Sequence, residues 1–424
     1  AIFDPVNPVH GLLTWLSVTL FGGSAIALRL PSVLLAFVGV WFMYKMVSRW
    51  HGKSNGLIAI VILSTSSWFL SIARWGTASI ESVVAPLALI WAWDSLIDEE
   101  RQKGLGLFVP IAVIALSLYS PMLIYLAVIL FILHFMEFIK MIKTMSILIR
   151  VMAFFTFMVA IAPLIVGLIF NGVLPWLGIE NGIPSIKEFG LTLIESFKHI
   201  FWSASSFAEL NIEKVPLLEI FTASMVALGL LKYERDNKPR SHMLLIGSGV
   251  LFIAIGLSQN IANTAVLLPI IYILAINGFI LLYHQWRQIF PKNPVAHYIV
   301  FIPLAILFLF TIRYHLTRYY IAWPNNNQTQ MVYKDHSRAI RDFIKDNKDI
   351  TIVVPGSIAP IAKISTIEHQ DSIEITNEIQ GDTVLVVSSL AKKDELEGYT
   401  LDQTIYSPYD NSKLFKLYIK NNSN

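Results

Sequence analysis

The sequence predicts an all-α polytopic membrane protein that ends in a small α/β domain. Of its 424 residues, 55% are hydrophobic and only 14% are charged, whereas soluble domains carry about 25% charged residues. The charges are clustered, because long segments contain no Asp, Glu, Lys or Arg: residues 105–133, 151–171, 241–283 and 293–312. Apolar runs of about 20 residues cross a bilayer as helices, since hydrocarbon forces backbone groups to bond within the segment.

The same composition argues against several other classes of protein. The net charge of +3 is too small to indicate a nucleic-acid partner. The absence of Cys excludes disulfides and Cys-zinc sites. The chain contains no phosphate-loop motif, no HExxH motif and no convincing dinucleotide fingerprint. No cofactor is predicted, and a requirement for a divalent metal is left open.

The N-terminal part, residues 1–29, is expected to be an extracytoplasmic loop with an interfacial helix. The chain opens with Ala1 in a loop, so we expect a further segment upstream. Residues 9–22 are too short to span comfortably and predict an amphipathic helix at the membrane interface.

Residues 30–324 are expected to form the transmembrane domain, with about ten helices. Tyr119-Ser120-Pro121 interrupts the long apolar stretch 105–133, so we divide it into a tight hairpin. Residues 172–214 form a long outer loop. The expected spans are 30–48, 56–73, 79–97, 105–119, 121–139, 147–171, 215–232, 242–258, 262–283 and 295–314.

The C-terminal part, residues 325–424, is charged and is expected to be a soluble extracytoplasmic α/β domain. Its apolar runs predict short strands at Ile350–Val354, Thr383–Ser388 and Leu414–Ile419. A helix is expected over His336–Asp346, where apolar residues recur at helical spacing.

The orientation follows from the distribution of basic residues, which are enriched in cytoplasmic loops. Alternate connections carry most of them, so this side is predicted to be cytoplasmic: Lys45, Arg49, Lys53, Arg101, Lys103, Lys140, Lys143, Arg150, Lys232, Arg235, Lys238, Arg240, Arg287 and Lys292. The chain start, the 172–214 loop and the tail are then extracytoplasmic.

Ionisable side chains are expensive at membrane depth, so those near the span ends are candidate functional groups. They gather on the side predicted to be extracytoplasmic. The candidate catalytic carboxylates are Asp4 and Glu81. The candidate substrate-binding residues are His10, Arg29, Arg74, Tyr119, Arg313 and Arg318.

This set of side chains suits a sugar linked to a lipid phosphate. Arg pairs with phosphate through charge-assisted, often bidentate hydrogen bonds. A carboxylate can take a proton from an acceptor hydroxyl. Aromatic rings suit sugar faces and the membrane interface.

The candidates also have structural explanations. Arg29 and Arg318 fit a role as side chains that snorkel to lipid head groups. Arg74 and Glu81 fit an ion pair that ties two helix ends. His10 has no second ligand at helical spacing, which favours an interfacial hydrogen bond over metal binding.

Three short segments carry the most specific pattern in the chain: Ala27–Ser32, Ser67–Gly76 and Leu116–Pro121. With the rest of residues 8–32, they resemble the dolichyl-phosphate-mannose protein mannosyltransferase and aminoarabinose-transferase superfamily. The Ala-Leu-Arg-Leu-Pro-Ser stretch is the closest match. The resemblance covers residues 1–140 well and the remainder in architecture.

The resemblance implies a GT-C-like helical bundle and a glycosyltransferase. Such enzymes take a sugar from a polyprenyl-phosphate donor at the outer membrane face and invert the anomeric centre. A carboxylate in the first outer loop acts as base, and basic residues hold the phosphate. The expected partners are therefore the polyprenyl-phosphate sugar donor, membrane lipids and an acceptor glycan, lipid or protein, but no nucleic acid.

The chain also departs from the family pattern at the acidic residues. The family's acidic pair follows a first transmembrane helix that is not in this sequence, and Asp4 is a candidate remnant of that loop. Two alternatives stay open: this sequence lacks the base, or the protein is a divergent member of the family. Relatives often place an acid four residues after the position of Arg74, where this chain has Ala78. Glu81 lies three residues later and faces the same way on a helix.

Two other functions fit a polytopic chain. A transporter or lipid flippase would show polar or broken helices near the midplane and often internal symmetry. A non-catalytic scaffold would only present the tail outside the membrane. The clustering of charges at one face, without a repeat, favours the glycosyltransferase.

Overall fold

The computed structural model describes most of the N-terminal two thirds of the chain, namely residues 7–22, 24–97, 104–179, 182–203, 211–212, 214–236 and 239–290. Beyond these it describes 292, 295, 299, 301–330, 339–340, 342–344, 350–354, 362, 373–376, 378–379, 382–388, 390, 396–406 and 413–421.

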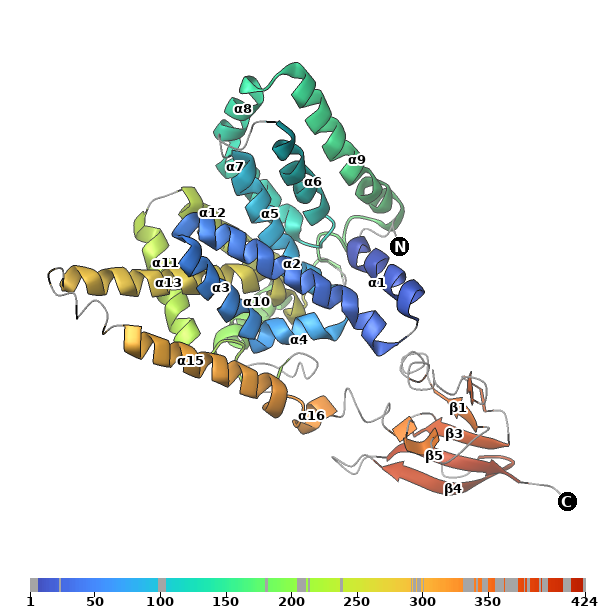
Figure 1. Cartoon of the computed structure of the whole chain (residues 1–424). Helices are drawn as coiled ribbons and strands as arrows, with labels where there is room; N and C mark the ends of the chain where they lie inside the picture. The colour runs from blue at the N-terminus through green and yellow to red at the C-terminus, as the bar shows by residue number, and fades with distance from the viewer. Residues whose placement is uncertain are drawn as a thin grey trace. The chain divides into compact units, whose positions relative to one another are not determined.

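The described residues are mainly helical and divide into two compact units (Figure 1). The larger unit contains Ala1–Leu16, Arg29–Ser206 and Glu213–Tyr319. Its helices, two of which begin or end outside it, are α1 (Pro8–Phe21), α2 (Ala25–His51), α3 (Lys53–Thr65), α4 (Ser67–Trp75), α5 (Glu81–Ile97), α6 (Phe108–Ser117), α7 (Leu123–Leu133), α8 (Phe135–Thr144), α9 (Ile147–Asn171), α10 (Ile186–Phe201), α11 (Ile220–Asp236), α12 (Pro239–Ser258), α13 (Leu268–Ile289) and α15 (Phe301–Thr317).

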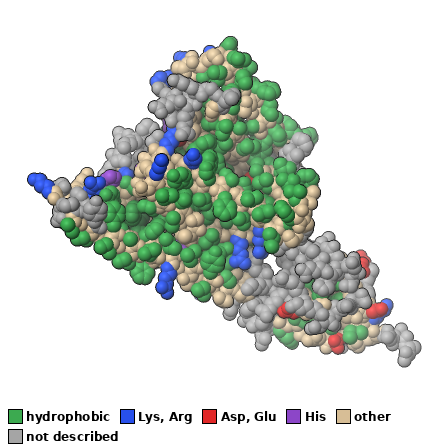
Figure 2. All heavy atoms as spheres, viewed as in Figure 1, with side chains coloured by type: hydrophobic (Ala, Val, Ile, Leu, Met, Phe, Trp, Pro, Cys, Tyr) green, Lys and Arg blue, Asp and Glu red, His purple; other side chains and the backbone are tan. Residues whose placement is uncertain are grey.

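The helices of this unit are those of a multi-pass membrane protein. Five of the described helical stretches are long and apolar enough to cross a membrane, and two bent pairs raise the number to seven. Hydrophobic side chains cover most of the helical face in Figure 2. The helix expected over residues 9–22 is present as α1, and the expected hairpin break lies between the end of α6 and the start of α7.

The spans expected over 56–73 and 121–139 are not straight helices. α3 and α4 meet at 62°, and α7 and α8 meet at 72°. Ser66 leaves the helical conformation, and its hydroxyl accepts the backbone N–H of Phe69 (3.4 Å), so it acts as the N-cap of α4. His134 separates α7 from α8 in the same way, without a side-chain cap.

The core of this unit forms around the first part of α13, where Leu268–Gly278 and Ile280 are buried. α11 packs along α13 at backbone contact, because Gly229 faces Gly278 across the two helices. A Cβ on Gly278 would lie 2.8 Å from the carbonyl carbon of Met225. Small residues at helix crossings allow this close approach in membrane proteins.

The smaller unit contains Ser17–Leu28, Phe207–Ile212 and Tyr320–Asn424, including a short helix, α16 (Asn327–Gln330). Its sheet has the order β2-β1-β3-β5-β4. β1 is parallel to β2 and β3, whereas β5 is antiparallel to β3 and β4. The strands are β1 (Ile350–Val353), β2 (Ile373–Thr376), β3 (Thr383–Val387), β4 (Tyr399–Tyr406) and β5 (Lys413–Lys420).

The three strands expected from apolar runs correspond to β1, β3 and β5, whose residues form the buried core of this sheet. β2 and β4 are more exposed and alternate less clearly, so the sequence did not predict them. The helix expected over His336–Asp346 falls mostly outside the described residues.

Candidate functional site

A buried polar cluster joins α1 to the turn between α4 and α5. The carboxylate of Glu81, the first residue of α5, accepts the backbone N–H of His10 in the first turn of α1. Both residues are 6% exposed. An N–H in the first helical turn has no partner within its own helix, and a carboxylate there is favoured by the helix dipole. Glu81 therefore caps α1 from another part of the chain.

The His10 ring extends this cluster to α2. Its Nε2 lies 2.8 Å from the Ser32 hydroxyl, which donates to the carbonyl of Thr77 at 3.1 Å. Since the Ser32 proton is used on Thr77, Nε2 carries the ring proton and donates to Ser32. Nδ1 lies 3.4 Å from the Thr14 hydroxyl. These hydrogen bonds hold the imidazole among α1, α2 and the α4–α5 turn.

Tyr119, just after α6, contacts the same region through its backbone. Its carbonyl accepts the N–H of Asn7 at 3.5 Å, directly before α1. Its hydroxyl donates to the carbonyl of Ala160 in α9 at 2.8 Å, and the ring packs with Leu118 and Leu164. Tyr119 is 5% exposed, so it supports the start of α1 from within the bundle.

Three predicted cations are exposed instead of buried: Arg29 on α2, Arg74 in the last turn of α4 and Arg313 on α15. The guanidinium of Arg74 lies 6.0 Å from the ring centre of Tyr319, at the limit of a cation–π contact. Arg74 and Glu81 thus flank the same short turn, with the cation outside and the carboxylate inside.

A second buried cluster surrounds the broken helix at Ser66. The Ser67 backbone N–H and hydroxyl lie 3.3 Å and 3.0 Å from His315 Nδ1, while His315 Nε2 lies 2.9 Å from the Glu219 carboxylate. Because a backbone N–H can only donate, Nδ1 is the acceptor and Nε2–H donates to Glu219. The Tyr272 hydroxyl donates to Ser66 at 2.6 Å.

Arg318 is buried beside this second cluster. Its guanidinium donates to the carbonyls of Pro216 (2.6 Å) and Val215 (3.2 Å), so it holds the segment before α11. His199 on α10, also buried, lies close enough for their charges to interact. Burial, with the charge of Arg318, lowers the pKa of His199 to about 4.

The structure therefore separates the predicted site residues. His10, Glu81 and Tyr119 belong to the first cluster and Arg318 borders the second, while Arg29, Arg74 and Arg313 are exposed. Asp4 lies outside the described residues. In the described parts of the chain, no group of three His, Cys, Asp or Glu side chains is arranged to hold a metal ion.

Sequence reasoning did not select Ser32, Ser67, Glu219 or Tyr272. Glu219 carried a usable signal, because it is an acid inside the expected span 215–232, and such acids are candidates by default. Ser32 and Ser67 belong to two of the segments that resemble the family, but nothing in those segments indicates their hydrogen-bond partners. Tyr272 carried no signal, since its partner comes from a distant part of the chain.

The chain is similar to a known family and to a known fold. Residues 5–166 match the sequence profile of the family described as dolichyl-phosphate-mannose-protein mannosyltransferase. No curated protein matches the chain as a whole or in part.

Two solved structures of ArnT from Cupriavidus metallidurans share the fold. The crystal structure bound to undecaprenyl phosphate has a TM-score of 0.58 at 11% identity, over 98% of this chain and 88% of that one. The apo crystal structure gives 0.57 at 10% identity, over 97% and 87%. The resemblance and the GT-C-like bundle with a C-terminal sheet domain, both expected from the sequence, are thereby confirmed.

Proposed function

We propose that this chain is a membrane glycosyltransferase that takes a sugar from a polyprenyl-phosphate donor and transfers it to an acceptor at the extracytoplasmic face. The observation that carries the proposal is the first polar cluster. It lies inside the segment that matches the mannosyltransferase family, and it is built from the residues that link α1 to the α4–α5 turn.

The reaction is a displacement at the anomeric carbon. The acceptor hydroxyl oxygen forms a bond to C1 of the sugar, and the bond from C1 to the phosphate oxygen breaks. The phosphate leaves with the electron pair, and a carboxylate takes the hydroxyl proton. The chain must therefore stabilise a phosphate that gains negative charge in the transition state.

Arg74 is the residue we assign to that phosphate. It is exposed beside an aromatic ring and flanks the turn whose interior is fixed by Glu81. Arg29 and Arg313 are further cations on exposed helix surfaces. A guanidinium offers five donors in a fixed fork, which matches phosphate oxygens. The match of ArnT, whose crystal structure holds undecaprenyl phosphate, supports this class of lipid donor.

The carboxylates take different parts in this proposal. Glu81 accepts an N–H from α1 and so acts as a positioning residue that holds the N-terminal segment against the bundle. We assign Asp4, the other candidate carboxylate, as the base. Arg318 and Tyr119, whose polar groups bond to carbonyls, support the site rather than contact the donor.

A transfer assay tests the function directly. The full protein, with any upstream segment, is purified and offered a panel of polyprenyl-phosphate hexoses and pentoses with a membrane extract as acceptor source. We expect transfer from at least one donor, with inversion at C1. A folded sample that transfers nothing from any donor would refute the proposal.

A further inference from the structure

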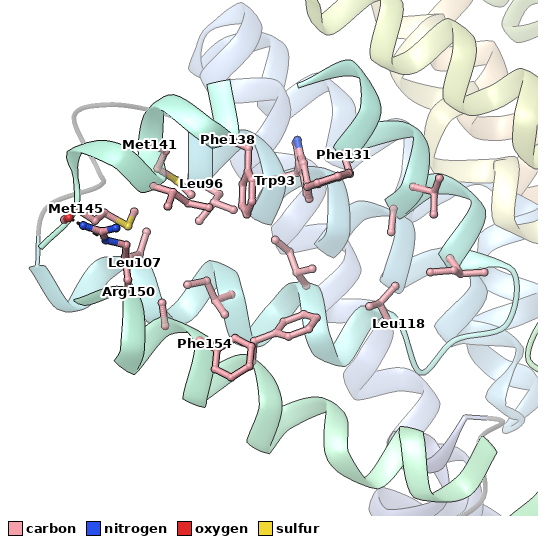
Figure 3. A pocket seen from close by; sticks show the side chains of 18 residues that line it. Trp93, Leu96, Leu107, Leu118, Phe131, Phe138, Met141, Met145, Arg150 and Phe154 are labelled. Carbon is pink, nitrogen blue, oxygen red and sulfur yellow. Dashed lines mark hydrogen bonds between the residues drawn. The ribbon is translucent and has the colours of Figure 1, made fainter. Parts of the chain in front are cut away.

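An apolar cavity lies between α5, α6, α7, α8 and α9. Its volume is about 510 Å³, which falls in the range of about 300–1,000 Å³ that ligand pockets have. Trp93, Leu107, Phe131 and Phe154 are among the apolar side chains around it. Of the described residues that line the cavity, Arg150 alone carries a charge, and Figure 3 shows it beside Met145 at one end.

The cavity runs along α6. Its lining includes Leu107, just before this helix, and Leu118, just after it, which lie at opposite ends in Figure 3. Eleven residues of helix correspond to roughly 16 Å at ~1.5 Å each, about half of a hydrocarbon core of ~30 Å, so the cavity is long enough for an acyl chain of one leaflet. Its charged end lies at the Leu107 end of α6, and its other end adjoins Tyr119.

The charged end is far from the first polar cluster. Leu96, near the end of α5, lines the cavity, whereas Glu81 begins the same helix. Fifteen residues along α5 separate them by roughly 22 Å. The connections on the Leu96 side carry the basic residues that predict the cytoplasmic face. The cavity mouth and the proposed catalytic turn thus belong to opposite membrane surfaces.

Arg150 is placed to bind an anion at this mouth. It lies in the first turn of α9, and its Nε donates to the carbonyl of Met145 at 3.2 Å. This bond uses one of the five guanidinium donors and orients the group. Its side chain is exposed, so a phosphate at the membrane surface can reach it.

Few residues of α9 are buried by other parts of the protein. Only 11% of its most apolar 18-residue window is buried inside the protein. It packs mainly on α6, and Phe154 and Phe157 line the cavity. An apolar chain in the cavity would contact α9, α7 and α8 together.

We propose that this cavity binds one acyl chain of an anionic phospholipid, with the lipid phosphate paired to Arg150, and that the bound lipid holds α9 against the bundle. The apolar lining favours an acyl chain, and the guanidinium of Arg150 favours an anionic head group. Arg150, at the charged end of the cavity, is not among the residues of the proposed donor site, so lipid binding and sugar transfer are tested by different residues.

The test measures lipid retention on the delipidated full protein by native mass spectrometry, and its thermal unfolding in detergent. The probes are phosphatidylglycerol and phosphatidylcholine with identical acyl chains. We expect phosphatidylglycerol to be retained preferentially and to raise the unfolding temperature. Arg150→Gln should reduce that preference about fivefold. Lys143→Gln, which removes an exposed charge from neighbouring α8, is the matched control and should leave it unchanged.

A cavity-filling variant provides the second arm. Ala153→Phe places a ring into the cavity, while Val151→Phe adds the same ring to an exposed position of α9. We expect only the former to lose bound lipid. If Ala153→Phe does not fold, the Arg150→Gln comparison decides alone.

Three results would overturn the proposal. They are equal retention of the two phospholipids, equal effects of Arg150→Gln and Lys143→Gln, and displacement of phosphatidylglycerol by a polyprenyl phosphate in an Arg150-dependent manner. The last would identify the donor lipid as the occupant.

Discussion

The crossing of α11 and α13 predicts a sharp response to a single methyl group. In Gly278→Ala, the new Cβ would overlap the Met225 carbonyl oxygen, and it would lie 2.8 Å from the Met225 carbonyl carbon and 3.0 Å from the Gly229 nitrogen. Ordinary contacts of a carbon atom are about 3.5–4.0 Å, so the helices must separate by about an ångström or more. Overpacking of this kind costs about 1–3 kcal/mol, occasionally more.

The higher helix propensity of Ala offsets up to about 1 kcal/mol of this cost. Because the overlap is with backbone, the cost lies at the upper end of this range, and we expect Gly278→Ala to lower the free energy of unfolding by about 2 kcal/mol or more, measured by thermal or denaturant unfolding in detergent. Gly249→Ala on α12 is the matched control, because its Cβ would meet no atom within 4 Å, and it should be neutral or slightly stabilising. Equal behaviour of the two variants would refute the close helix contact.

Three further predictions concern buried polar groups. The free energy of unfolding should fall as the pH drops from about 6.5 towards 4, because His199 takes up a proton more readily in the unfolded chain than in the folded one. In unfolding curves measured over this pH range, His199→Gln should reduce the loss of free energy by at most about 3 kcal/mol. An unchanged pH dependence would contradict the burial of the ring. Glu219→Gln should cost about 1–3 kcal/mol of unfolding free energy, because the charge-assisted bond from His315 is lost; an unaffected unfolding midpoint would contradict that bond. Glu81→Ala should lower the free energy of unfolding by about 1 kcal/mol and make backbone hydrogen exchange faster in the first turn of α1, around His10. An exchange rate equal to that of the parent protein would contradict the capping role of Glu81.

The helices could be predicted where the reason for them is local. Charge-free runs such as 151–171 are helical because the backbone has no other way to satisfy its hydrogen bonds in hydrocarbon, and α9 follows that run closely. The strands β1, β3 and β5 were predictable for a similar reason, because apolar runs mark the buried part of the sheet.

The breaks in the helices could not be predicted in this way. Ser66 lies in a run without Pro or Gly next to it, and its conformation depends on Tyr272, which bonds to its hydroxyl from 206 residues away. A Ser inside an apolar helix is otherwise compatible with an unbroken span. The local N-cap at Ser66 and the distant bond from Tyr272 both stabilise this bend, and only the first can be read from the sequence.

The candidate site was predictable in its place but not in its connections. Arg74 and Glu81 flank the turn between α4 and α5, as their spacing from the apolar runs predicts. The bond from His10 to Glu81 joins residues 71 positions apart, and that from His315 to Glu219 joins residues 96 positions apart. Neither pair of residues could be predicted from the sequence, because each pairing depends on which helices pack together.

The role of Arg74 is the most direct test of the proposed glycosyltransferase. With a polyprenyl-phosphate sugar that the parent protein accepts, initial rates of transfer are measured for Arg74→Ala and for Arg287→Ala, an exposed cation at the end of α13. Loss of a group that stabilises the leaving phosphate should lower kcat by about 10²–10³-fold, while Arg287→Ala should keep the parent rate. Parent-like transfer by Arg74→Ala would contradict the assignment of this turn as the phosphate site.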